Sequence, residues 1–192
     1  MKSIFAALIV ISLAGTAGAS SSYFYGTNNA DTIIVGRAFN GGGLVYMACI
    51  NNVWEVGGIV TGSSDTISVS ANGGNDVVTV RATNDLYNCG GYVKWFYRLD
   101  YYSSCPGAVY LSGNPGNDII TGGQCVERLY GGDGNDTLRG GAGYDYIEAS
   151  PGDDCIDDLS VSNLLCGAGY DRYTPGGSWG DCEELVKMCP DL

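Results

Sequence analysis

Acidic residues recur every nine positions in the C-terminal half of this chain. The series is Asp118, Glu127, Asp136, Asp145 and Asp154, and further polar side chains stand beside it: Asn117, Asp133, Asn135 and Asp153. Carboxylate, amide and backbone oxygens, without nitrogen or sulfur donors, are the ligands of a hard cation, and Ca²⁺ tolerates irregular oxygen cages best. The spacing therefore predicts a row of calcium sites.

The same nine-residue period organises the residues around these acids. Written in nines from Gly113, the chain reads GNPGNDIIT, GGQCVERLY, GGDGNDTLR, GGAGYDYIE, ASPGDDCID and DLSVSNLLC. The eighth position, from one unit earlier onward, is aliphatic throughout: Leu111, Ile120, Leu129, Leu138, Ile147, Ile156 and Leu165. Glycines at the first, second and fourth positions allow the positive φ angles of a tight turn. Each unit thus predicts a six-residue turn followed by a three-residue strand with one inward side chain.

Two such units complete one coil, with strands stacked about 4.8 Å apart. Acids two units apart then share an edge: Asp118, Asp136 and Asp154 on the first, and Glu127, Asp145 and Asn163 on the second. Stacked carboxylates repel one another unless a cation lies between them. The expected fold is all-β, a right-handed parallel β-solenoid (a β-roll or β-helix). The first edge is the better calcium site because its three acids are all aspartates.

These units resemble the RTX, or haemolysin-type, calcium-binding repeats, whose motif is GGxGxDxUx with U a large apolar residue. Residues 131–139 and 140–148 match the motif fully, and residues 113–121 and 149–157 match it in part. In that family, turn aspartates and turn carbonyls of neighbouring coils share each calcium ion. The resemblance implies four ligands here: Asp118, Asp136, Asp145 and Asp154.

The upstream half resembles a looser version of the same coils. ADTIIV (30–35), SDTISV (64–69) and GNDVVTV (74–80) each place an aspartate before a β-branched strand. Their spacing is irregular, so Asp31, Asp65 and Asp76 are weaker ligand candidates. The alternative, that these carboxylates cap turns by accepting backbone N–H groups, is at least as well founded.

The first residues have the pattern of a secretory signal peptide. Lys2 precedes an apolar run from Ile4 to Leu13, and Ala17-Gly18-Ala19 fits a cleavage site. Removal of residues 1–19 would change the formal net charge from −12 to −13, because Lys2 is lost. This acidity argues against nucleic acid and anionic membranes as partners and favours cations. We expect an exported product, extracellular or periplasmic, without a membrane span.

Eight cysteines in an exported chain indicate disulfides rather than metal thiolates. The chain has no histidine and no CxxC pair, so the ligand spacing of a zinc site is missing. Eight cysteines allow 105 pairings, among which the sequence does not choose. Five lie from Cys125 onward, so a disulfide-tied cap is expected after the last coil, with Asp181 starting a short helical turn. The expected organisation is 1–19 signal peptide, 20–112 degenerate solenoid coils, 113–166 calcium-binding β-roll and 167–192 C-terminal cap.

Residues 92–102, YVKWFYRLDYY, combine aromatics with Lys94 and Arg98. The expected arrangement is a strand pair whose rings pack on the solenoid. The alternative is a platform that contacts carbohydrate.

Calcium binding by an exported, non-enzymatic module, with Ca²⁺ completing the fold in a structural or interaction role, is the function that the sequence favours. One alternative is a secreted polysaccharide-acting β-helix enzyme that uses Lys94, Arg98 or Arg81. Another is a calcium-dependent adhesin for an extracellular polysaccharide or a cell surface. The missing histidine excludes the usual protease relays, and the missing GK[ST] excludes a nucleotide cradle.

Overall fold

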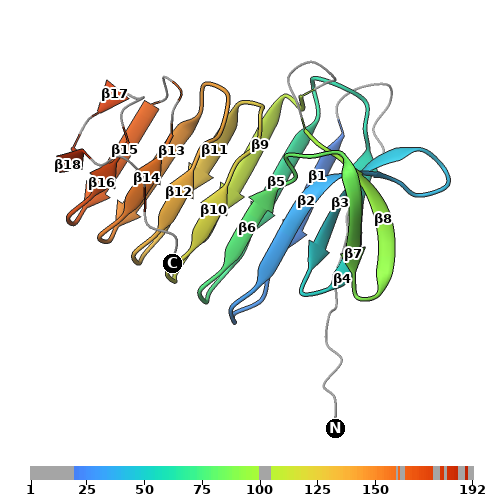
Figure 1. The fold of residues 1–192 in the computed structure, drawn as a ribbon, viewed down its shortest axis with the longest axis horizontal. Helices are drawn as coiled ribbons and strands as arrows, with labels where there is room; N and C mark the ends of the chain where they lie inside the picture. The colour runs from blue at the N-terminus through green and yellow to red at the C-terminus, as the bar shows by residue number, and fades with distance from the viewer. Residues whose placement is uncertain are drawn as a thin grey trace, which may run out of the picture.

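The computed structural model describes residues 20–99, 105–158, 160, 163–174, 178–179, 181–185 and 189. All regular elements in these residues are β-strands, and none of the described segments is a helix long and apolar enough to span a membrane. The expected signal peptide (1–19) and the end of the aromatic segment (100–102) lie outside the described residues. The strands form two sheets that extend along one long axis and enclose the core between them (Figure 1).

Sheet A has seven strands and is parallel throughout. Its spatial order is β1 (Ser21–Tyr25), β5 (Thr66–Ser70), β9 (Ala108–Ser112), β11 (Glu127–Tyr130), β13 (Tyr146–Pro151), β15 (Asn163–Ala168) and β17 (Ser178–Trp179).

Sheet B has eleven strands and is mixed. Its main path is β18 (Glu184–Leu185), β16 (Arg172–Tyr173), β14 (Cys155–Asp157), β12 (Thr137–Arg139), β10 (Ile119–Thr121), β6 (Val77–Val80), β2 (Thr32–Phe39), β3 (Leu44–Ile50) and β4 (Val53–Ile59). Strands β7 (Asp85–Cys89) and β8 (Tyr92–Tyr97) lie off this path. Pairing is parallel from β18 to β2 and antiparallel beyond β2, so the expectation of a wholly parallel fold holds in sheet A and not in sheet B.

From β9 onward the strands alternate between the two sheets, so two strands make one coil. The pairing follows the predicted step of two units: Leu111 pairs with Leu129 and then Ile147 in sheet A, and Ile120 pairs with Leu138 and then Ile156 in sheet B. All six side chains are completely buried and fill the narrow space between the sheets. Each contributes about 2 kcal/mol by leaving water.

The turns show why glycine recurs at their second position. The backbone φ there is positive at Asn114 (72°), Gly132 (122°), Gly141 (96°) and Ser150 (81°). Glycine and asparagine reach this region most easily, so the repeated glycine fixes the turn geometry.

The coil register slips by one residue after β13. Ile147 pairs with Leu164, seventeen residues on, and Leu164 is buried whereas Leu165 is 39% exposed. The prediction of Leu165 as the inward residue is therefore wrong. The unit DLSVSNLLC has lost the turn glycines, and a slip of one residue moves a side chain to the opposite face of a strand.

Two antiparallel hairpins form the N-terminal end of the stack. Strand β3 pairs with β2 and β4, β7 pairs with β8, and the Cys49–Cys89 disulfide joins β3 to β7. Trp54 packs against Tyr87 and Phe96, with ring centroids 6.1 and 5.0 Å away. Residues 92–97 form strand β8, which pairs with β7, so the predicted strand pair is confirmed. The prediction that its aromatics pack on the solenoid holds for the buried Phe96 and not for Tyr92 and Trp95, which are 74% and 53% exposed.

The C-terminal residues are tied by two disulfides, Cys155–Cys189 and Cys166–Cys182. The predicted helical turn is wrong in the described part, because Glu184 and Leu185 pair with β16 as strand β18. The Asp181 carboxylate accepts the N–H of Cys166 at 2.9 Å and so ties two segments together instead of starting a helix.

Candidate metal centre

A continuous row of acids runs along one edge of the stack, at the start of the sheet B strands. Each backbone N–H donates to the carboxylate one coil further on: Asp31 to Asp76, Asp76 to Asp118, Asp118 to Asp136 and Asp136 to Asp154 at 2.7 Å, and Asp154 to Asp171 at 2.9 Å. We name these six residues the acid ladder. The structure thus brings together the predicted first-edge residues Asp118, Asp136 and Asp154, and extends the row in both directions.

From Asp76 to Asp171, only one oxygen of each ladder carboxylate is used in this way. The second oxygen, Oδ2, is buried and has no hydrogen-bond partner in the described structure at five ladder positions: Asp76, Asp118, Asp136, Asp154 and Asp171. A buried, unpartnered carboxylate oxygen is costly, so a protein keeps one only where a proton or a cation satisfies it.

Burial raises the pKa of five ladder carboxyls, those of Asp76, Asp118, Asp136, Asp154 and Asp171, and the neighbouring acids raise it further. The pKa of Asp136 rises to about 8 because of burial and then the charges of Asp154 and Asp118, against the opposing effect of the Asp118 N–H. Burial likewise raises the pKa of Asp154 to about 7 and that of Asp118 to about 6. Near neutral pH the carboxyls of Asp118, Asp136 and Asp154 are therefore partly protonated unless a cation replaces the protons.

The space beside Oδ2 is lined by oxygen and kept open by glycine. A Cβ atom added at Gly131 would touch Asp136 Oδ2 and the carbonyl of Ala149, and one added at Gly113 would touch Asp118 Oδ2 and the carbonyl of Gly131. Carboxylate and carbonyl oxygens from neighbouring coils thus face the same cradle. This all-oxygen donor set fits a hard cation such as Ca²⁺.

The second edge also gathers acids, with a different composition. The N–H of Glu127 donates to Asp145 Oδ1 at 2.8 Å, and burial followed by the charge of Asp145 raises the pKa of Glu127. A Cβ at Gly140 would lie 2.8 Å from Asp145 Oδ2 and 2.7 Å from Asp158 Oδ2. Asp158, which stands where earlier units have a first glycine, therefore joins this edge. Asn163 does not, since it pairs with Tyr146 after the register slip and is exposed, so its place in the predicted row is wrong.

The family described as RTX calcium-binding nonapeptide repeat (4 copies) matches residues 106–124, 110–138 and 130–157. Residues 106–157 are RTX repeats. RTX nonapeptide repeats bind Ca²⁺, which implies calcium binding and a structural role for the matched segment. No curated protein and no solved structure matches the chain.

The acid ladder is longer than the RTX match. Asp31 and Asp76 precede the matched residues, and Asp171 follows them. Beyond Asp171, whose N–H donates to Glu183 Oε2 at 2.8 Å, the row ends in a glutamate. Asp171 was missed because its distance from Asp145 fits no whole number of units. Measured from Asp154 it lies one slipped coil of 17 residues away, and the RTX-like string GAGYDRY was the available signal.

The fifth residues of the RTX turns form a second, exposed row. Side-chain oxygens accept the N–H of the next turn: Asn117 donates to Asn75, Asn135 to Asn117, Asp153 to Asn135 and Tyr170 to Asp153, at 2.9–3.0 Å. These oxygens therefore tie turns together. The Asp133 side chain is exposed, while its carbonyl accepts the N–H of Gly116 at 2.9 Å.

Two upstream aspartates behave as turn caps, which was the alternative open for them. Asp65 accepts N–H groups from Ser20, Thr61 and Gly62 at 2.8–3.0 Å, together with the Tyr46 hydroxyl at 2.9 Å. Burial would raise the pKa of Asp65, but the bonds from the Thr61 hydroxyl and from the N–H groups of Ser20, Gly62 and Thr61 outweigh burial and lower it to about 2.

Asp31 is satisfied in a similar way. Its carboxylate accepts the backbone N–H and hydroxyl of Thr27 and the amide of Asn51. Asp76, by contrast, keeps a free Oδ2 and belongs with the RTX acids.

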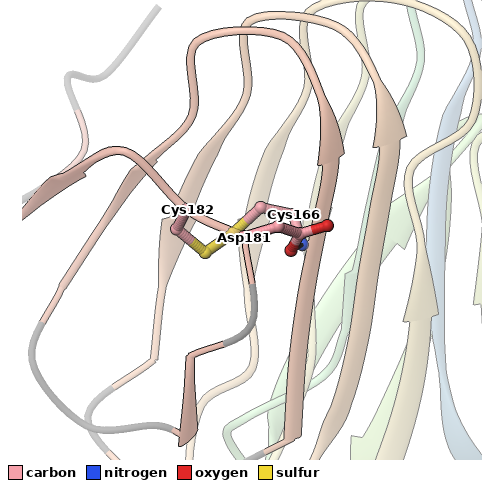
Figure 2. Close-up of side chains that lie close together, drawn as sticks. All are labelled: Cys166, Asp181 and Cys182. Carbon is pink, nitrogen blue, oxygen red and sulfur yellow. Dashed lines mark hydrogen bonds between the residues drawn. A yellow bond between two sulfur atoms is a disulfide. The ribbon is translucent and has the colours of Figure 1, made fainter.

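One further group combines potential metal ligands: Cys166, Asp181 and Cys182 (Figure 2). The two sulfurs are joined in a disulfide, so neither is a thiolate. The Asp181 carboxylate accepts the N–H groups of Cys166 and Gly167 at 2.9 and 3.3 Å. This group is a structural tie.

Proposed function

We propose that this chain is an exported calcium-binding module in which turn acids of neighbouring coils hold Ca²⁺ and complete a right-handed parallel β-solenoid. The observation that carries the proposal is the repeated buried Oδ2 atom without a hydrogen-bond partner, next to a carbonyl of the following coil, within RTX repeats. An ion at this place would satisfy the carboxylate and relieve the repulsion between coils.

The ligand residues follow from this geometry. Asp118, Asp136 and Asp154 would hold ions along the first edge, and Asp76 and Asp171 would extend the series because their Oδ2 atoms share the same situation. Glu127 and Asp145 would serve the second edge with Asp158. Asn117, Asn135, Asp133 and Asp153 would shape the turns around the ions, with their backbone carbonyls as further ligands.

The disulfides and the repeats together favour an extracellular setting. All eight cysteines are paired, including Cys105 with Cys125 at the entry to the repeats, and such bonds persist in oxidising compartments. In this setting residues 1–19 would be a cleaved signal peptide, 20–112 degenerate coils, 113–166 the calcium-binding β-roll and 167–192 a cap. Low calcium during export and high calcium outside would then make folding depend on the destination.

We do not extend the proposal to catalysis. The RTX calcium-binding repeat is generally non-catalytic, and no described contact assembles an acid, a base and a cation around a substrate space. Arg81, one of the cations that an enzyme would need, is ion-paired with Asp85 and stacks over Tyr87 at 5.2 Å.

The proposal is tested by calorimetric titration of the oxidised protein with Ca²⁺, using Mg²⁺ as the control ion. Binding of two or more ions is expected, with Kd in the range of about 10⁻⁴–10⁻³ M that is typical of extracellular modules. Asp136→Asn should remove at least one ion. Asp85→Asn, which makes the same charge change in a hairpin outside the ladder, should remove none. No heat of binding at millimolar Ca²⁺ would refute the proposal.

A further inference from the structure

The outer face of sheet A carries two rows of side chains that calcium binding does not use. They flank the buried row and run along the stack. In strand order from β1 to β15, one row is Tyr23, Ser68, Tyr110, Arg128, Tyr146 and Asn163, and the other is Tyr25, Ser70, Ser112, Tyr130, Glu148 and Leu165. Five of the chain's 14 tyrosines therefore lie on one face of a parallel sheet.

The corresponding rows of sheet B provide an internal comparison. Beside its buried row lie Val77, Ile119, Thr137, Cys155 and Arg172, and Thr79, Thr121, Arg139 and Asp157. None of these residues is aromatic. Since both sheets have the same parallel pairing here, the coil geometry does not require the tyrosines of sheet A.

The sheet A face is also close to neutral. Its two rows contain one arginine and one glutamate, whereas the whole chain has 21 acids and 9 lysines and arginines. The remaining positions are mostly hydroxyl-bearing. A charged polymer finds little complementarity on such a face, while a neutral polymer rich in hydroxyl groups finds apolar rings and hydrogen-bonding partners together.

The first row places its rings at a regular interval. Tyr23, Tyr110 and Tyr146 lie on every second strand, β1, β9 and β13, so their Cα atoms are about 10 Å apart from the strand spacing. This interval is close to the length of two pyranose rings joined by an extended β-1,4 bond. The apolar face of every second sugar would thus meet a ring.

Neighbouring side chains hold two of these rings, those of Tyr110 and Tyr146, in place. The Arg128 guanidinium lies over the Tyr110 ring, 5.3 Å from its centroid, and donates to its hydroxyl at 3.3 Å. The Tyr146 hydroxyl donates to Glu148 at 2.9 Å, and its ring packs 5.9 Å from that of Tyr130. Rings fixed in this way lose little conformational entropy when a ligand binds.

We propose that the outer face of sheet A binds a neutral, linear, β-1,4-linked polysaccharide, lying along the stack and contacting Tyr23, Tyr110 and Tyr146. This role is independent of the acid ladder, whose side chains lie in the turns at the edge of the stack. The expected ligand is an extended glucan or chitin-like polymer rather than an acidic one.

The test is a pull-down of the oxidised protein, at saturating Ca²⁺, with insoluble cellulose and chitin. Granular starch, a neutral polymer with α-linkages, and polygalacturonate, a charged one, are the comparison polymers. Binding to a β-1,4 polymer is expected, and Tyr110→Ala combined with Tyr146→Ala should weaken it at least about tenfold. Calcium titrations of the same variant should be unchanged, which separates this result from the calcium function.

The matched control is Tyr144→Ala, an equally large truncation of a tyrosine that is 73% exposed in a turn outside both rows. It should bind as the parent protein does. Equal binding by the double variant, or no binding to either β-1,4 polymer, would overturn the proposal. So would sedimentation showing that the tyrosine face pairs two copies of the chain, because the face would then be covered.

Discussion

Asp65 and Asp136 occupy the same place, immediately before a strand, in two different regions of the molecule, and their carboxyl groups behave in opposite ways. Both are buried, with 0% and 2% exposure. Hydrogen bonds outweigh burial and hold the pKa of Asp65 at about 2, whereas burial and then the neighbouring acids raise that of Asp136 to about 8. Burial alone therefore does not decide the state of a buried acid.

The difference comes from where the turn's N–H groups point. In the upstream turn, Thr61 and Gly62 donate to the Asp65 carboxylate. In the turn of residues 131–136, the N–H groups of Gly131, Gly132 and Gly134 instead donate to carbonyls of the next coil, at 2.9–3.2 Å. The tight stacking of nine-residue turns thus removes the donors that a carboxylate would otherwise use. Close stacking and the need for a cation arise from one hydrogen-bond pattern.

The largest effect is expected for Asp65→Ala. The substitution leaves buried donors, including the Tyr46 hydroxyl, without their acceptor, and should lower the free energy of unfolding by about 3 kcal/mol. Because this carboxylate is satisfied by the protein itself, chemical denaturation should give the same loss with and without Ca²⁺. A loss that appears only with Ca²⁺ would place Asp65 among the metal ligands instead.

Asp136→Asn should destabilise the protein when Ca²⁺ is present and stabilise it when Ca²⁺ is absent. With Ca²⁺ at about ten times Kd, the loss of one ion should cost about 1.4 kcal/mol of stability. In chelator at pH 8 the variant should be more stable than the parent, because a repelling buried charge is gone. Denaturation curves in Ca²⁺ and in chelator measure both. Destabilisation of equal size in both conditions would mean that Asp136 acts as a cap, like Asp65.

The calcium-free protein should lose stability as pH rises. Asp118, Asp136 and Asp154 have folded pKa values of about 6, 8 and 7, above the unfolded value near 4. Groups with a raised folded pKa stabilise the fold fully below the unfolded pKa, and this contribution is lost as pH rises through the folded values. Calorimetry in chelator should show Tm falling between pH 4 and 8, and saturating Ca²⁺ should flatten the slope. A rising Tm in chelator would contradict the ladder.

The smallest effect on calcium binding is expected for Gly131→Ala. The new methyl group would enter the cradle between Asp136 Oδ2 and the Ala149 carbonyl, and should weaken Ca²⁺ binding by about tenfold, or about 1.4 kcal/mol or less. Gly43→Ala is the control, since no atom lies within 4 Å of its added Cβ. Calorimetric titration of both variants compares them. Unchanged binding by Gly131→Ala would mean that the ion lies elsewhere.

The regular part of the ladder was predictable from the sequence because the period alone determines it. Two strands per coil and nine residues per repeat unit place Asp118, Asp136 and Asp154 on one edge. The nonapeptide frame also marks the glycines whose positive φ the turns need, such as Gly132 and Gly134.

The irregular part was not predictable, since residue counting fails wherever a coil changes length. Asp31 and Asp76 are separated by 45 residues, and Asp76 and Asp118 by 42, because the antiparallel hairpins β3–β4 and β7–β8 are inserted between successive parallel strands. At Leu164 a single missing residue has the same effect. The hydrogen-bond partners of an acid could not be predicted from the sequence either. Asp65 and Asp136 both follow a turn and precede a threonine, yet only the Asp65 carboxylate caps its turn.

The positions of the disulfides have a kinetic consequence. Cys105–Cys125 closes the entry to the repeats, Cys155–Cys189 and Cys166–Cys182 close the exit, and no cysteine lies between Cys125 and Cys155. The coils that most need an ion therefore lie between disulfides at both of their ends. When calcium is withdrawn, these coils can loosen while the disulfides keep the segments at each end paired. The strands then do not have to search for their partners across the whole chain. When calcium returns, the coils should refold rapidly and in the original register, so that calcium can be removed and rebound repeatedly.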